Sequence, residues 1–335
     1  MIKIGDVVLD NHIIVGPMAG ISNYSFRSII KQFNPALIYS EMISDKAICY
    51  ENKKTIKMTE VDENEKPITL QLFGKDVDTL VKAAQFLDNN TNCDIIDLNM
   101  GCPVPKVCKS NGGSSLMLDV EYSSQIVKAI CDNVKKPVTV KIRAGWDSNH
   151  INGVDFACQM AKTGIKALAI HPRTRAQYYS GHSDWNMIKQ IKEKITNIPI
   201  IGNGDIFSLQ DYLNMKQLTH CDFFMVSRGS LGNPWLIKQL VDYDKYSVIT
   251  ENPTMIEKLN QCILHCQKLI ELKGEKTGIK EMRGHACWYI NSMPHANKVK
   301  AQINHMENYQ QFVQIIESYR TMIENDDFSQ LDDIN

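Results

Sequence analysis

Short runs of apolar, mostly β-branched residues recur along the first two thirds of the chain, and stretches with helical spacing of apolar residues separate them. Uninterrupted apolar strands that alternate with amphipathic helices are typical of a parallel sheet covered on both faces. The runs predict eight strands, at residues 12–16, 37–41, 67–72, 94–99, 137–142, 167–171, 198–202 and 222–227.

Eight strand–helix units within about 240 residues match a (β/α)8 TIM barrel, an α/β fold of roughly 250 residues. An open doubly wound sheet is the alternative. It is disfavoured because there are eight units and because no GxGxxG motif follows the first strand. We therefore predict a barrel over residues 1–245.

The pattern changes after about residue 245, where apolar residues keep helical spacing and strand signals become rare. We predict a small all-α helical domain over residues 250–325. The last ten residues, "DDFSQLDDIN", predict a solvated acidic tail at 326–335.

The composition is that of an ordinary globular protein, with 43% hydrophobic and 22% charged residues among 335. The start of the chain lacks the pattern of a signal peptide, and no apolar run is long enough to span a membrane. Ten cysteines occur without a CxxC pair, so we expect no metal site. A reducing cytoplasm and a monomeric protein are the expectations.

The formal net charge of −1 excludes a global basic field, so a nucleic-acid partner would need a local basic surface. Residues 258–305 carry eight Lys or Arg against three Glu, whereas residues 306–335 carry one Arg against seven acids. The alternative is that these lysines belong to solvated helix faces, as most runs of charge do. The basic stretch also contains donors and a stacking surface suited to RNA, namely His265, His285, His295, His305 and Trp288.

Unusual polar residues follow the predicted strands at their carboxyl ends, where barrel enzymes have their active sites. They occur in "GPMAG", "NMGCP", "KIRAGW", "HPRTRAQ", "GNGDI" and "SRGSLGNP", and at Gln71. Cys102 stands between Gly101 and Pro103, which both discourage regular structure, so we place it in the loop that leaves the fourth strand.

The loops after the seventh and eighth strands form the usual phosphate site of a barrel. "GNGD" and "SRGS" supply glycines for close backbone approach and Arg228 for a charged contact. The alternative is that these glycines only allow tight turns.

Lys141 and Arg143 end the fifth strand, and we expect them on alternate faces. A lysine at the last inward position points to an electron-rich ligand group, because burying an unpaired ammonium is costly. An ion pair with an acidic neighbour is the alternative. His171, which ends the sixth strand, is either a ligand contact or a hydrogen-bonded core residue.

These motifs, together with "QLFG", "GGSSLM", "RGHACWYI" and "MPHAN", resemble those of tRNA-dihydrouridine synthases in the same order, and the bacterial B-type subgroup is the most similar. The resemblance covers the barrel and extends into the helical part. It implies a flavoenzyme with FMN on the barrel, NADPH as electron donor and tRNA held with help from the helical domain.

The resemblance also assigns roles to individual residues. Cys102 would be the general acid. The cofactor would be held by Pro17, Met18, Ala19, Gln71, Lys141 and His171, and its phosphate by Asn203, Gly204, Asp205, Ser227 and Arg228. We expect the RNA to contact Asn99, Lys106, Arg143, Arg173, Arg175, Lys298 and Lys300.

The implied reaction reduces the C5=C6 bond of specific tRNA uridines to 5,6-dihydrouridine. Reduced FMN would deliver a hydride to C6, and Cys102 would deliver a proton to C5, since a thiol with a pKa of about 8.5 is protonated at neutral pH. Two alternatives remain. One is a barrel flavoenzyme that reduces a small free pyrimidine or enone, and the other is a non-catalytic tRNA-binding module.

Overall fold

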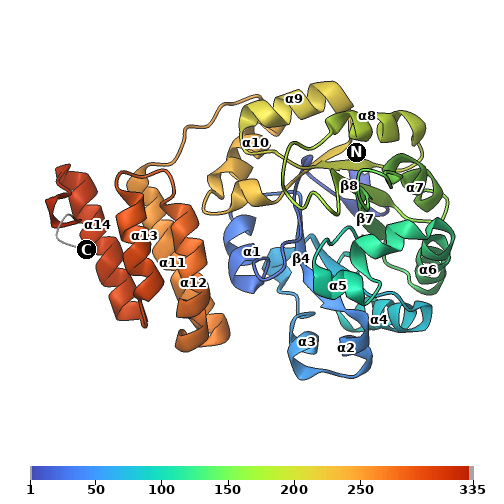
Figure 1. Ribbon diagram of the computed structural model, residues 1–335, viewed down its shortest axis with the longest axis horizontal. Helices are drawn as coiled ribbons and strands as arrows, with labels where there is room; N and C mark the ends of the chain where they lie inside the picture. Colours follow the sequence, from blue (N-terminus) through green and yellow to red (C-terminus); the bar gives the residue numbers. More distant parts are fainter. Residues whose placement is uncertain (1, 332–335) are drawn as a thin grey trace.

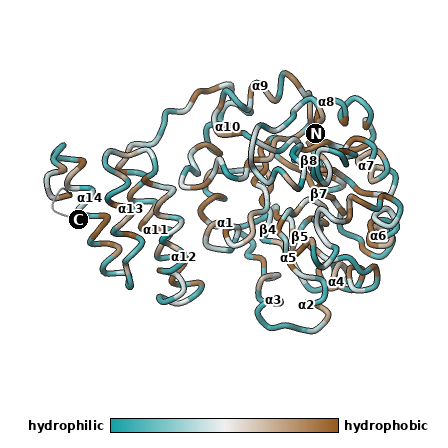
Figure 2. Tube along the Cα trace, viewed as in Figure 1, coloured by the Kyte–Doolittle hydropathy of each residue, from teal (hydrophilic) through white to brown (hydrophobic). Residues whose placement is uncertain are grey.

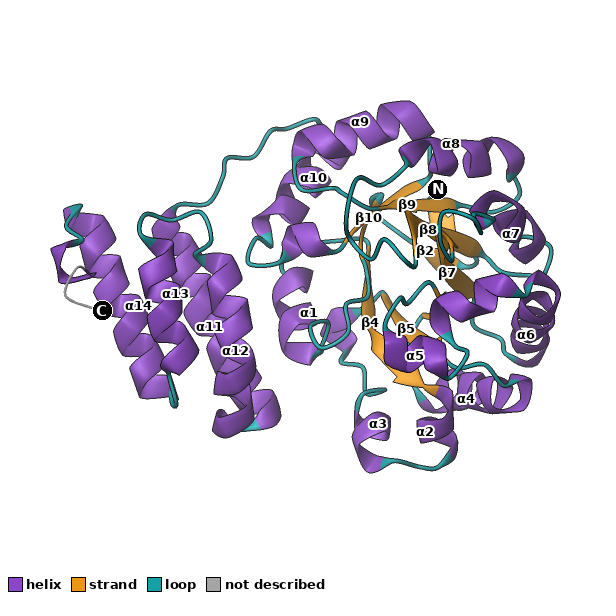
Figure 3. Cartoon of the chain, in the orientation of Figure 1, coloured by secondary structure: helices purple, strands orange, loops and turns teal. Residues whose placement is uncertain are grey.

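Eight parallel strands close into a barrel in the computed structural model, which describes residues 2–331 (Figures 1 and 3). The strands follow one another around the barrel in chain order, and the last pairs with the first through Phe224 and Ile13. The barrel prediction is confirmed. The strands are β3 (Ile13–Val15), β4 (Leu37–Ser44), β5 (Ile68–Phe73), β6 (Ile95–Met100), β7 (Val138–Gly145), β8 (Ala167–Thr174), β9 (Ile200–Asn203) and β10 (Phe223–Val226).

Helices surround the barrel, and the longer ones bury one apolar face against the strands (Figure 1). In α4, for example, the buried residues are Leu80, Ala83, Ala84 and Leu87, which have the spacing of one helix face, and Asp76 caps the first turn. The helices are α1 (Tyr24–Lys31), α2 (Asp45–Cys49), α3 (Lys53–Lys57), α4 (Val77–Asn90), α5 (Pro105–Lys109), α6 (Val120–Asn133), α7 (Gly153–Met160), α8 (Trp185–Lys194), α9 (Leu209–Thr219) and α10 (Trp235–Tyr246).

A short hairpin of β1 (Lys3–Ile4) and β2 (Val7–Val8) packs at the amino-terminal end of the barrel strands. Ile4 is fully buried in one cluster with interior barrel residues that include Ile14, Ala169 and Met225. This hairpin was not predicted, because each of its strands has only two residues. Apolar side chains therefore fill the barrel interior near the amino-terminal ends of the strands. Polar side chains gather near the carboxyl ends of the strands.

Four further helices form a separate bundle beside the barrel, α11 (Met255–Lys273), α12 (Glu275–Tyr289), α13 (Ala296–His305) and α14 (Tyr309–Asn325) (Figure 1). Apolar and polar segments alternate along each of them (Figure 2). The bundle has its own core, in which Cys262 and Cys266 are fully buried. The barrel and the bundle meet where the ring of Phe26 in α1 lies 6.4 Å from that of His265 in α11.

The described part of the predicted acidic tail differs from expectation, because it packs on the bundle. Leu331 is only 1% exposed within the bundle core, and the Phe328 ring stacks on His295 with centroids 4.6 Å apart. These two apolar residues interrupt the acidic run and outweigh its charge. Residues 332–335 lie outside the described residues. No helix in residues 2–331 has the length and apolar content needed to cross a membrane.

Candidate active site

A cavity of about 360 Å³ opens at the carboxyl ends of the barrel strands. The fold brings together there every residue predicted for the cofactor, although they come from six separate segments of the chain. The lining includes Pro17, Met18, Ala19, Gln71, Lys141, His171, Asn203, Gly204, Asp205, Ser227 and Arg228, as well as Cys102, Asn99 and Arg143.

The loop after β3 forms one wall of this cavity with apolar atoms of Pro17, Met18 and Ala19. Close packing fixes where this loop leaves the strand. A Cβ atom on Gly16 would lie 2.6 Å from both Met225 Sδ and Ser227 Oγ, so no side chain fits at this position. Gly16 therefore lets the loop pack directly against the carboxyl end of β10.

A chain of buried hydrogen bonds connects the barrel interior to the loop that carries Cys102. Thr139 Oγ1 donates to Asp97 Oδ1 at 2.6 Å, and Gln71 Nε2 donates to Asp97 Oδ2 at 2.8 Å. Asn99 Nδ2 in turn donates to Gln71 Oε1 at 2.8 Å. Asn99 Oδ1 then accepts from the Cys102 amide at 2.8 Å. The side-chain amides of Gln71 and Asn99 are thereby oriented, and the Cys102 backbone is held in one place.

Asp97, which was not among the predicted site residues, anchors this chain of hydrogen bonds. It is fully buried, and burial raises its pKa to about 6, against the lowering effects of the Thr139 and Gln71 hydrogen bonds and the nearby Lys141 ammonium. A signal existed in the sequence. An aspartate two residues before Asn99 in a parallel strand shares its inward face.

Cys102 is 9% exposed and lines the cavity. Its carbonyl oxygen accepts hydrogen bonds from the amide and the hydroxyl of Ser114, at 3.1 and 2.9 Å. Gly113 has φ of +59°, and a Cβ atom there would lie 2.9 Å from the same carbonyl. Burial raises the pKa of the Cys102 thiol, which therefore stays protonated at neutral pH.

Lys141 and Arg143 both line the cavity, so the expectation of alternate faces was wrong. Side chains two residues apart in a strand point to the same face. Burial, followed by the nearby Arg143 charge, lowers the pKa of Lys141 to about 8. Within residues 2–331 its ammonium makes no hydrogen bond or ion pair with the protein. The acidic neighbour that we considered is Asp97, which acts only as a nearby charge.

Arg143 uses its guanidinium group mainly to hold backbone. Its Nε donates to the carbonyl of Gly101 at 2.8 Å, and its Nη1 donates to the carbonyls of Thr174 and Tyr178 at 3.0 and 2.8 Å. The side chain is 4% exposed. Arg143 thus ties the Cys102 loop to the loop after β8, in addition to lining the cavity.

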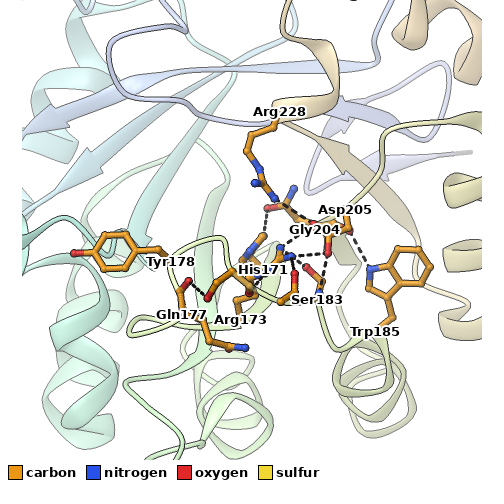
Figure 4. A network of polar contacts seen from close by, with 12 residues as sticks. His171, Arg173, Gln177, Tyr178, Ser183, Trp185, Gly204, Asp205 and Arg228 are labelled. Atoms are coloured by element: carbon orange, nitrogen blue, oxygen red, sulfur yellow. Dashed lines mark hydrogen bonds and ion pairs between the residues drawn. The ribbon is translucent and has the colours of Figure 1, made fainter. Parts of the chain in front are cut away.

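His171 lines the cavity, and one of its ring nitrogens is held by a neighbouring side chain (Figure 4). Asn203 Nδ2 donates to the Met225 carbonyl at 2.7 Å, which leaves Asn203 Oδ1 to accept from His171 Nδ1 at 3.2 Å. Burial lowers the pKa of His171 well below its usual value, so the ring is neutral and Nε2 carries a lone pair. Nε2 is buried without a hydrogen-bond partner among the described residues.

The predicted phosphate region is built around the Asp205 carboxylate (Figure 4). Arg173 Nη1 and Nη2 donate to its two oxygens at 2.8 and 2.7 Å, and Arg228 Nη2 donates at 3.1 Å. These partners lower the pKa of Asp205 although burial opposes them. The Arg228 guanidinium lies 4.4 Å from the Tyr179 ring centroid and 5.5 Å from that of Phe207. Asp205 therefore orients the cation of this region.

The residues predicted to contact RNA do not all lie at one place. Arg173 is 2% exposed and fully engaged with Asp205 and nearby carbonyls, so it supports the site from behind. Arg175 stacks on Trp146 and is not among the residues that line the cavity. Lys106 is exposed on α5, and Lys298 and Lys300 lie on α13 in the bundle.

Two of the four histidines expected to supply RNA contacts cannot do so. His265 and His285 are 1% and 4% exposed, and their rings lie 4.4 Å apart within the bundle. Burial lowers the pKa of both, to about 4 for His285. The sequence contained a signal for His265, because it shares the helical spacing of the buried Cys262, Cys266 and Leu269.

Comparisons with known proteins show which family this chain is similar to. A model of the family described as "Dihydrouridine synthase (Dus)" matches residues 13–325. The probable tRNA-dihydrouridine synthase of Rickettsia conorii is 35% identical over 309 residues, which cover 92% of this chain and 93% of the relative. The tRNA-dihydrouridine synthase B of Pasteurella multocida is 36% identical over 292 residues, which cover 87% of each chain.

Among solved structures, histamine dehydrogenase from Rhizobium sp. 4-9 matches 96% of this chain and 64% of its own, with a TM-score of 0.57 at 12% identity. That likeness shows the fold alone. The family match and the sequence relatives span nearly the whole chain, including the bundle. The chain therefore belongs to the dihydrouridine synthase family.

Proposed function

We propose that this protein reduces specific uridines in tRNA to 5,6-dihydrouridine, with FMN as its flavin and NADPH as its reductant. One observation carries the proposal. A single cavity contains a protonated thiol, an unpaired ammonium and a buried imidazole nitrogen without a partner, and an oriented arginine lies in its phosphate region. The names of the relatives supply the substrate.

The residues present fit a planar, anionic cofactor such as FMN. The apolar loop after β3 offers a face for a ring system, and the unpaired His171 Nε2 and the Lys141 ammonium supply an acceptor and a donor at its edge. Arg228 and the glycines of "GNGD" and "SRGS" would take the phosphate, as in other barrels. When bound, reduced flavin supplies the hydride.

The chain's own groups supply the proton and hold the reacting base. Cys102 would transfer its thiol proton to C5 of the uracil, and the resulting thiolate would be reprotonated from solvent. The Asp97–Gln71–Asn99 hydrogen bonds and the Arg143 contact to Gly101 fix the Cys102 backbone before substrate arrives. This arrangement avoids reorganisation during the proton transfer.

A first test is the visible absorption of the purified protein with and without added FMN. Flavin bands that remain after gel filtration support the cofactor assignment. A protein that is colourless and takes up no FMN would refute it. We further propose a monomer that acts in the cytoplasm, and its ten unpaired cysteines agree with a reducing compartment.

The Asp97 hydrogen bonds lead to a separate prediction. Asp97→Ala removes the acceptor of both Gln71 and Thr139, so we expect the rate of dihydrouridine formation to fall by about tenfold or more, the effect of leaving buried donors unpaired. Asp97→Asn can still accept from Gln71 and donate to Thr139, and should retain most of the rate. Thermal unfolding of both variants separates loss of fold from loss of positioning. Equal rates in the two variants would contradict this role.

The basic stretch at residues 258–305 leads to another prediction. Among the described residues, Lys300 Nζ donates to a neutral group, Asn291 Oδ1, at 2.6 Å, and Lys298 is an exposed residue two positions earlier on α13. Replacing both with alanine should weaken tRNA binding and reduce the slope of log K against log salt by about one to two units. Flavin content and NADPH oxidation should not change.

The matched control for that experiment is Lys135→Ala with Lys162→Ala. Both lysines are exposed, and they precede β7 and β8 at the opposite end of the barrel from the cavity. If the bundle variant binds tRNA with the same affinity and salt dependence as this control, the docking surface lies at the barrel mouth near Arg175.

A further inference from the structure

A second cavity, of about 550 Å³, lies on the other side of the segment that carries Cys102. Residues 101–104 line the first cavity, whereas Pro105, Cys108 and Lys109 line the second. Residues between 111 and 122 form a large part of its lining, and three residues that follow barrel strands contribute the rest, namely Lys75 after β5, Trp146 after β7 and Arg175 after β8. The segment 101–109, which carries Cys102, therefore contributes residues to both cavities.

One wall of the second cavity is a stack of Arg175 on Trp146. The guanidinium carbon lies 4.6 Å from the centroid of the indole ring, and the Tyr178 ring lies 6.0 Å from the same carbon. Arg175 Nε is buried and has no hydrogen-bond partner within residues 2–331. Such planar groups bind unpaired nucleic-acid bases by stacking, largely without regard to base identity.

The charge of this cavity is positive. Lys75 and Lys109 are both exposed, and neither makes an ion pair with any part of the chain that the structure describes. Asp119 is the one acid among the lining residues. Its carboxylate accepts the Tyr122 amide at 2.9 Å as the amino-terminal cap of α6 and forms no ion pair with either lysine among the described residues. Lys75, Lys109 and Arg175 therefore outnumber the one acid of the lining.

We propose that the second cavity binds a nucleotide that flanks the target uridine. Its base would stack against Arg175 and Trp146, and its phosphate would lie between Lys75 and Lys109. The inference rests on the proposed function, because an RNA strand that places one base over Cys102 must continue past the loop that carries it. Holding the neighbouring nucleotide would favour the extruded position of the target base.

The first experiment removes the two phosphate contacts with Lys75→Ala and Lys109→Ala together. We expect the KM for tRNA to rise about tenfold and the salt slope of binding to fall by about one to two units. Flavin content, flavin reduction by NADPH and kcat at saturating tRNA should match those of the Lys135→Ala, Lys162→Ala control. A KM and salt slope equal to the control would overturn the proposal.

A second experiment tests the stacking wall with Trp146→Leu, a smaller apolar replacement chosen to preserve packing. Loss of base stacking should raise the KM for tRNA about fivefold or more. It should leave the salt slope unchanged, since no charge is removed. A variant with wild-type KM and an unaltered unfolding temperature would contradict the stacking role.

The outcome for the wild-type enzyme separates this inference from the proposed function. If the wild type forms no dihydrouridine in tRNA, the proposed function fails. If the wild type is active and both cavity variants match their controls, only the flanking-nucleotide site fails.

Discussion

Replacing Cys102 with alanine should lower the rate of dihydrouridine formation by about 10²-fold or more, the usual contribution of a general acid. Reduction of bound flavin by NADPH should continue at nearly the wild-type rate, because that half-reaction needs no proton from the thiol. Rapid mixing with NADPH, followed by a separate addition of tRNA, measures the two steps independently. An equal loss in both half-reactions would mean that Cys102 serves flavin packing instead.

The same variant should change the pH dependence. Burial raises the pKa of the Cys102 thiol, so the acid form persists through neutral pH and is lost only as pH rises above that raised value. The wild-type rate of dihydrouridine formation should therefore decline at alkaline pH, and the residual rate of Cys102→Ala should lack that decline. Cys131→Ala on α6 is the control for removing a half-buried thiol, and it should behave as wild type.

Replacing Lys141 with alanine should weaken FMN binding by about tenfold to a hundredfold, which is the effect of losing one charge-assisted hydrogen bond. The ammonium would lie against the electron-rich edge of the ring and favour negative charge there in the reduced state. Titration of the flavin-free protein with FMN, followed by fluorescence, measures the change. Unaltered affinity would remove Lys141 from the cofactor site.

The pKa of Lys141 also predicts how the FMN affinity measured in this titration depends on pH. Because burial lowers that pKa to about 8 in the flavin-free protein, FMN affinity should fall as pH rises from 7 to about 9. In Lys141→Ala that fall should be absent. In Asp97→Asn it should move to lower pH, since the Asp97 charge supports the ammonium.

The fold was largely predictable because its signals are local. Continuous apolar strands with polar residues at their carboxyl ends predicted both the barrel and the residues that line its cavity, from Gln71 to Arg228. The β1–β2 hairpin and the short α2 and α3 escaped prediction because two-residue strands and five-residue helices are too short to show a period.

Other features depended on contacts between distant segments. Nothing local shows that Arg173 pairs with Asp205 or that Arg143 holds the carbonyls of Gly101 and Thr174. By contrast, the helical spacing of His265 relative to Cys262 and Leu269 did indicate that it is buried. The two-residue periodicity of a strand likewise places Lys141 and Arg143 on the same face. In these two cases the pattern was present and was interpreted wrongly.

The central claim is that reduced flavin in this cavity transfers its electrons to a uridine within tRNA. The most direct measurement reduces the protein anaerobically and mixes it with tRNA that lacks dihydrouridine, while flavin absorbance and dihydrouridine content are followed together. We predict that flavin reoxidation and dihydrouridine formation occur at the same rate with tRNA, and that free uridine produces neither. Rapid reoxidation by free uridine or a small enone, or reoxidation by tRNA without dihydrouridine, would contradict the account.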